Sequence, residues 1–210
     1  MPSATRIQYE LSSEGFLDRL LTDDLILRYV KDDYEFSRLY TEFYDTEDWL
    51  LTNKGYSLDA TPELAIPVCH LAKGFVWSKE LPGLFRGDTW TAPFEGPETM
   101  AASLGERGAP MEFLELAQSR TLVKHFVINQ SNQSTTLYLP DRTRICMAFE
   151  NLLITAGSLE ERRFVLSMDL LFGEENQLIN YCQQIRERFD LPPVIHSRQQ
   201  RALHLIRSAE

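Results

Sequence analysis

The sequence predicts an α+β protein built on an antiparallel sheet or a closed β-barrel. Short segments rich in aromatic and β-branched residues recur throughout the 210 residues, and Pro, Gly, Asn or Asp residues separate them. A few amphipathic helices lie between these segments, a mixture typical of a sheet that helices cover. Neither a linker nor an internal repeat is visible, so residues 1–210 are expected to form a single domain.

The first element is a strand over residues 6–12. Apolar and polar side chains alternate there, so Ile7, Tyr9 and Leu11 would lie on one face. The opposite face would carry Arg6, Gln8, Glu10 and Ser12. A serine at position 12 or 13 can then cap a helix over residues 16–21, and a second short helix is expected over residues 25–29.

The later elements are mostly strands. They are expected over residues 37–45, 54–60, 72–79, 85–93, 119–129, 134–139, 143–150 and 163–171. The polar run 129–134 is predicted to be the turn of a hairpin. Helices are expected over residues 98–104, 111–117 and 174–189, and residues 200–207 are expected to form a short helix or strand.

Charge and composition exclude some classes of function. The formal net charge of -10 argues against binding nucleic acid or an anionic membrane, because both need a basic face. No apolar run is long enough to predict a membrane-spanning helix, and the first residues contain no apolar signal core. The three cysteines are far apart in the sequence, which suits a reducing compartment. We therefore expect a cytoplasmic location.

One stretch carries a resemblance to a known family. Phe43-Tyr-Asp-Thr46, followed by Lys54-Gly-Tyr-Ser-Leu58, resembles the signature of the CYTH family, also called triphosphate tunnel metalloenzymes. Further segments are similar to other motifs of that family and occur in the same order, namely residues 84–94, Arg120, residues 145–150, residues 164–169, residues 191–198 and Arg201.

The resemblance implies an antiparallel, eight-stranded closed β-barrel with flanking helices. The interior of such a barrel is a polar tunnel in which basic residues hold a triphosphate and carboxylates hold Mg²⁺ or Mn²⁺. The candidate anion-binding residues are Lys79, Arg120, Arg144, Arg198 and Arg201. The candidate metal ligands are Glu10, Glu150 and Asp169. The alternative for the acids is that they lie on the polar faces of strands, solvated or paired with arginine. The alternative for the basic residues is an internal Arg–Glu network with no ligand.

The sequence also departs from the family pattern. Gln8 and Ser12 stand where the first strand should carry charge, and Asp59 stands where an arginine is expected. Val165 and Ser167 replace glutamates of the metal-binding strand. Phosphoryl transfer depends on neutralising developing charge, and Mg²⁺ depends on carboxylates. The departures therefore predict that the metal and triphosphate site is degenerate and that inherited catalysis is lost.

Three hypotheses about function remain open at this point. The first is a non-catalytic protein that binds an anion, such as a nucleotide, a triphosphate or another anionic metabolite, or that binds a protein partner. The second is an active triphosphatase or adenylate cyclase with a rearranged site and bound Mg²⁺ or Mn²⁺; only this hypothesis requires a cofactor. The third is a protein-binding scaffold whose barrel is plugged.

Overall fold

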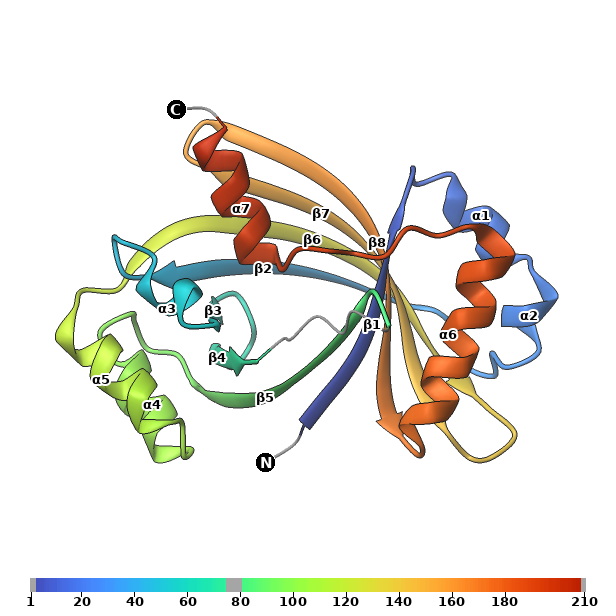
Figure 1. Cartoon of the computed structure of the whole chain (residues 1–210), viewed down its shortest axis with the longest axis horizontal. Helices are drawn as coiled ribbons and strands as arrows, with labels where there is room; N and C mark the ends of the chain where they lie inside the picture. The colour runs from blue at the N-terminus through green and yellow to red at the C-terminus, as the bar shows by residue number, and fades with distance from the viewer. Residues whose placement is uncertain (1–2, 75–80, 209–210) are drawn as a thin grey trace.

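The computed structural model describes residues 3–74 and 81–208, and its centre is a sheet of eight strands (Figure 1). The strands are β1 Ser3–Leu11, β2 Glu35–Asp45, β3 Tyr56–Thr61, β4 Val68–Lys73, β5 Leu84–Pro93, β6 Val123–Tyr138, β7 Arg144–Ala156 and β8 Leu159–Phe172. The helices are α1 Phe16–Leu21, α2 Asp24–Leu27, α3 Leu50–Asn53, α4 Met100–Glu106, α5 Met111–Ser119, α6 Glu175–Phe189 and α7 Arg198–Arg207.

The strands close into an antiparallel barrel in the order β1-β5-β4-β3-β2-β6-β7-β8. This arrangement confirms the predicted eight-stranded barrel with flanking helices. β1 is the closing strand, because it pairs with β5 on one side and with β8 on the other. Arg6 marks the junction, since it lies opposite Phe85 of β5 and opposite Asp169 of β8.

The predicted hairpin turn at residues 129–134 is wrong. These residues lie inside β6, which pairs with β2 along one edge and with β7 along the other. Gln130 is buried in this stretch, and its side-chain amide donates to the Asn132 carboxamide oxygen at 2.7 Å. Asparagine and glutamine are here polar residues of a long strand, because neighbouring strands on both sides bond the backbone.

The strand predicted over residues 72–79 overlaps the observed strand β4 only at residues 72 and 73. β4 ends at Lys73, and residues 75–79 of that prediction lie outside the described residues. The uncertain element over residues 200–207 is a helix, α7. Among the described residues, no helix is both long and apolar enough to cross a membrane.

Helices cover two parts of the outer barrel surface (Figure 1). α1, α2 and α6 pack on an apolar cluster that includes Ile7, Tyr9, Leu166 and Met168. α4 and α5 pack on a second cluster, which includes Trp90. The apolar residues of these two clusters face outward from the strands and are buried under helices, which leaves the alternate side chains for the lumen.

A third cluster lies inside the barrel, under α7. It contains Phe43, Phe126, Leu152 and Val165, together with Ala202 of α7. The rings of Phe43 and Phe126 stack with centroids 4.4 Å apart. Part of the lumen is therefore filled by side chains and by a helix, which is the usual fate of a small barrel interior.

The Tyr-Asp-Thr turn has a clear structural role. The buried Asp45 carboxylate accepts hydrogen bonds from the backbone N–H groups of Thr46, Leu51 and Thr52, at 2.7, 2.8 and 2.9 Å. Gly55 follows with φ of 78°, a conformation that favours glycine. The turn, α3 and Gly55 together direct the chain from β2 into β3, and so position the inward side chains of β3.

Candidate functional site

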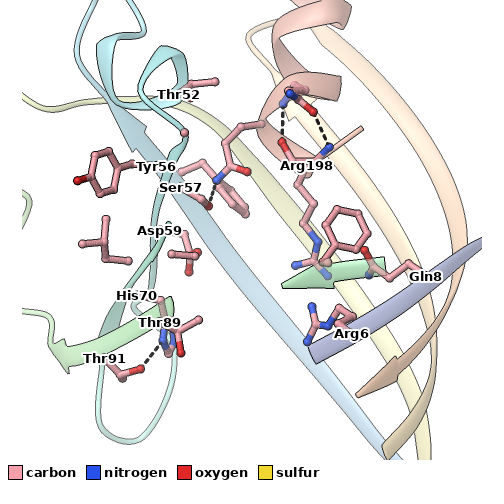
Figure 2. A pocket seen from close by; sticks show the side chains of 18 of the residues that line it. Arg6, Gln8, Thr52, Tyr56, Ser57, Asp59, His70, Thr89, Thr91 and Arg198 are labelled. Atoms are coloured by element: carbon pink, nitrogen blue, oxygen red, sulfur yellow. Dashed lines mark hydrogen bonds between the residues drawn. The ribbon is translucent and has the colours of Figure 1, made fainter. Parts of the chain in front are cut away.

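The open part of the lumen is a cavity of about 440 Å³ between β1, β3, β4, β5 and α7 (Figure 2). One wall is a row of direct cross-strand partners: Thr91 of β5, His70 of β4, Asp59 of β3 and Phe43 of β2. A volume of this size falls within the range of roughly 300–1,000 Å³ found for small-molecule sites.

α7 forms another boundary of the cavity, and its sequence explains why it begins at Arg198. The Ser197 hydroxyl accepts from the Gln200 backbone N–H at 3.2 Å, and the Gln200 side chain accepts from the Ser197 N–H at 3.0 Å. This capping box satisfies two backbone donors at the start of the helix. The Gln199 side chain donates to the Ser57 hydroxyl of β3. α7 is thereby fixed with its first turn over the cavity.

Two arginines of α7 pair with lumen carboxylates. Arg198 Nη2 lies 2.9 Å from the Glu150 carboxylate, and Glu150 is only 5% exposed. Arg201 pairs with Glu10, and Arg163 Nη1 lies 3.9 Å from the same carboxylate. A buried carboxylate needs such a partner, because desolvation of an isolated charge is costly.

A third pair joins two strands. Arg6 Nε of β1 donates to Asp169 Oδ1 of β8 at 2.5 Å. Burial alone would lower the pKa of Arg6, but the Asp169 and Glu150 carboxylates outweigh it and raise that pKa. Gln8 extends the same contact between strands, because its amide donates to the Ser167 hydroxyl at 2.7 Å. This side of the lumen thus neutralises its own charges.

Asp59 is in a different situation. No side chain among residues 3–74 and 81–208 makes a hydrogen bond or an ion pair with its carboxylate. Burial raises the pKa of Asp59 to about 7, and the charge of Arg198 offsets this only in part. The neighbouring His70 has a pKa lowered by burial, and its Nδ1 lies 3.0 Å from the Thr91 hydroxyl.

The structure brings most of the predicted site residues together. Glu10, Glu150, Asp169, Arg198 and Arg201 all belong to the acid–arginine pairs of the lumen. Arg120 and Arg144 are instead exposed, and the Arg144 guanidinium lies 5.5 Å from the centroid of the Tyr138 ring. Lys79 lies outside the described residues. The assigned roles of these residues in anion and metal binding stay predictions.

The described carboxylates of the lumen do not form a cluster of the kind that a divalent cation requires. Within the described parts of the chain, no group of three or more His, Cys, Asp or Glu side chains could hold a metal ion. The three predicted carboxylates each accept from an arginine, whereas Mg²⁺ needs carboxylate oxygens free to coordinate it. The arrangement as it stands does not fit a divalent cation.

Sequence reasoning missed several residues of this site. Arg6 shares the inward face of β1 with Gln8 and Glu10, and the alternation of that strand already carried this signal. His70 had no recognisable spacing to another ligand or catalytic residue, and only the pairing of β3 with β4 places it opposite Asp59. Gln199 likewise gave no signal, because its contact with Ser57 spans the barrel.

Comparison with known proteins identifies the fold. No protein-family model matches the sequence, and no curated protein matches it. A solved structure of a proposed adenylyl cyclase from Hippeastrum, described as having a dominant triphosphatase activity, is similar with a TM-score of 0.58 and 12% identity; the match covers 99% of this chain and 96% of that one. A proposed adenylate cyclase from Bacillus halodurans matches with a TM-score of 0.59 and 15% identity, over 96% and 98% of the two chains.

A third structure, the PH1819 protein from Pyrococcus horikoshii, has a TM-score of 0.54 and 7% identity, over 97% of this chain and 99% of that one. At these identities the likeness concerns the fold. It confirms the predicted resemblance to the CYTH-type tunnel fold, and the match extends over nearly the whole chain.

Proposed function

Taking the CYTH-type tunnel fold as the premise, we propose that this protein binds a small anionic metabolite in the lumen and does not hydrolyse triphosphates. The supporting observation is the pair of guanidinium groups of Arg6 and Arg198, which line the cavity. In Figure 2 both groups lie on the same side of the cavity and project into it. A compact anion such as a phosphate or carboxylate group is the ligand that guanidinium groups suit best.

Both arginines keep donors for such a ligand. Among the described residues, Arg6 donates to a carboxylate only through Nε, and Arg198 only through Nη2. A guanidinium has five N–H groups, so most of their donors are uncommitted. Glu150 and Asp169 hold the two heads in place, which reduces the entropy lost when an anion binds.

The state of the lumen carboxylates supports the proposal that the protein does not hydrolyse triphosphates. Triphosphate cleavage of the kind expected for this fold needs carboxylates to hold a metal ion that neutralises developing charge. Here each of the three candidate metal ligands forms an ion pair with an arginine, namely Glu10, Glu150 and Asp169. Freeing them would leave three half-buried arginines without their partners, which costs free energy because guanidinium groups partly removed from water lose their compensating charge.

Calorimetric titration is the direct test. Inorganic phosphate, tripolyphosphate and ATP are titrated with and without Mg²⁺ or Mn²⁺, and phosphate release is followed in parallel. We expect metal-independent binding of at least one of these anions, weakened about tenfold or more in Arg198→Gln. Arg144→Gln is the matched control, because Arg144 is exposed and lies outside the cavity. Circular dichroism of each variant checks that the barrel is intact.

Two results would overturn the proposal. Metal-dependent phosphate release that Glu10→Ala abolishes would favour an active triphosphatase or adenylate cyclase. No binding of any anion would favour the scaffold hypothesis, which α7 supports because it fills part of the lumen. Exposed Phe36 and Phe172 would then be the first residues to examine as partner contacts, by light scattering of the wild type and of alanine variants.

A further inference from the structure

The two charged sides of the cavity face each other. Figure 2 places the Asp59 side chain on the β3 side of the cavity, opposite the guanidinium groups of Arg6 and Arg198. All three residues line the same space, and the charge of Arg198 acts on Asp59. A ligand that fills the cavity would therefore meet cationic groups at one end and a carboxylate at the other.

Asp59 stands apart from the other lumen acids. Glu10, Glu150 and Asp169 each have an arginine partner, whereas Asp59 has neither an ion pair nor a hydrogen bond to its carboxylate within residues 3–74 and 81–208. An unpartnered carboxylate that is partly removed from water is costly, and a ligand cation would offset that cost.

We propose that the cavity takes a zwitterionic metabolite, with its anionic group on Arg6 and Arg198 and a protonated amine on Asp59. This inference rests on the anion-binding function proposed above. It adds the second charge of the ligand and the residue that recognises it. The step involves binding only, so no bond is made or broken.

The rest of the cavity suits such a ligand. His70 does not oppose an ammonium group, because burial lowers its pKa and favours the neutral ring. Thr89 and Thr91 of β5 add hydroxyl groups to the cavity wall that also carries Asp59, and Phe43 and Phe85 offer apolar surface to a short carbon chain. The raised pKa of Asp59, about 7, is the state of the site without a cation, and a bound ammonium would favour the ionised carboxylate.

A matched set of probes tests this inference without altering the protein. Phosphoethanolamine, ethyl phosphate and 2-hydroxyethyl phosphate share a phosphate and a two-carbon chain, and they end in an ammonium, a methyl and a hydroxyl group. We expect phosphoethanolamine to bind at least about tenfold more tightly than the other two at pH 8, the factor expected for one charge-assisted hydrogen bond. Isothermal titration calorimetry on the full chain measures all three affinities.

The variant Asp59→Asn then tests whether the Asp59 carboxylate is the group that binds the ammonium. The amide has the same shape but no charge, so the affinity for phosphoethanolamine should fall about tenfold. The affinity for ethyl phosphate should rise, because a like charge is removed from the cavity. The control is Asp88→Asn, since Asp88 is exposed on β5 and is not among the residues that line the cavity. It should leave the ranking of the three probes as in the wild type.

The outcomes separate the two proposals. Equal binding of the three probes overturns the zwitterion inference and leaves anion binding standing. A preference for phosphoethanolamine shared by 2-hydroxyethyl phosphate also overturns it, because a hydrogen bond rather than charge would be recognised. If none of the three probes binds, and the inorganic anions also fail, anion binding itself fails. If Asp59→Asn does not fold, the affinities of the wild type for the three probes still decide whether the cavity prefers a zwitterion.

Discussion

The two walls of the lumen handle charge in opposite ways. The wall formed by β1, β7 and β8, here called the paired wall, carries Glu10, Glu150 and Asp169, and each carboxylate meets an arginine. The wall formed by β3, β4 and β5, here called the open wall, carries Asp59, which no described residue pairs. The carboxylates of the paired wall are neutralised by arginines of the chain itself. The carboxylate of the open wall would be neutralised by the ligand cation proposed above.

Four changes test this contrast, beginning with the apolar packing on which both walls rest. Phe126→Ala removes a ring that is 3% exposed and stacked on Phe43 inside the barrel. We expect a loss of about 4 kcal/mol in the free energy of unfolding, the usual cost of a large cavity in a core. Urea denaturation measures it. Phe36→Ala, at a side chain 77% exposed, should change stability by less than about 0.5 kcal/mol.

Removing a partner from the paired wall should have the next largest effect. Arg198→Leu leaves the buried Glu150 carboxylate without its guanidinium, and we expect a loss of about 3 kcal/mol. The double variant with Glu150→Leu should recover part of this loss, because no uncompensated charge remains. Chemical denaturation of both singles, the double and Arg144→Leu gives the comparison. A loss from Arg198→Leu no larger than that from Arg144→Leu would contradict a paired wall.

Neutralising Asp59 of the open wall should stabilise the protein, and the gain in the free energy of unfolding should grow as pH rises from about 4 to 7. The folded-state pKa of Asp59 is about 7, above its ordinary value of 3.8, so the folded state binds more protons between these values. Stability contributed by this group therefore falls as pH rises from about 4 to 7. The full rise of the Asp59 pKa corresponds to a loss of about 4 kcal/mol in the free energy of unfolding. We expect about half of this loss, because the carboxylate faces an open cavity and is partly screened by water.

The measurement compares unfolding free energies of the wild type and Asp59→Asn at pH 4 and pH 8. The variant should be more stable by about 2 kcal/mol at pH 8, with most of that advantage gone at pH 4, close to the ordinary pKa of an aspartate. Taking the difference between the two proteins cancels the other groups that titrate in this range. A pH-independent difference would show that the carboxylate is paired in solution.

The smallest expected effect concerns the helix that joins the walls. Ser197→Ala removes the hydroxyl of the capping box that begins α7, and should cost about 1 kcal/mol. Since α7 carries Arg198, binding of inorganic phosphate should weaken in parallel. Ser208→Ala, at the exposed end of the same helix, is the control. Unchanged stability in Ser197→Ala would mean that α7 is held by its pairs and its apolar contacts alone.

Much of the fold was readable from the sequence because its signals are local. The alternation of residues 6–12, the turn at Asp45 and the amphipathic pattern of α6 each depend on neighbours along the chain. Residues 129–134 were wrongly predicted to form a hairpin turn, because such a polar run is typical of a turn. Their place in β6 depends on hydrogen bonds with β2 and β7, which are remote in the sequence.

The candidate site was readable only in part. The resemblance singled out Glu10, Glu150, Arg198 and Arg201 and raised the alternative of acid–arginine pairing, but the partner of each acid was not assigned. Those partners lie far away in the sequence; Glu10 and Arg201 are 191 residues apart. Asp59 drew notice as a reversed charge, yet only the assembled lumen shows that none of the described residues pairs with it.

The position of β1 has a consequence for how the chain folds. The barrel closes only when this N-terminal strand finds both β5 and β8, whose residues are about 80 and 160 positions further along. Contacts this remote in sequence carry a large loop-closure entropy, so refolding should be slow, in the millisecond-to-second range or beyond. During synthesis, β1 is made before both of its partners and must wait, unpaired on at least one edge, until β8 has left the ribosome.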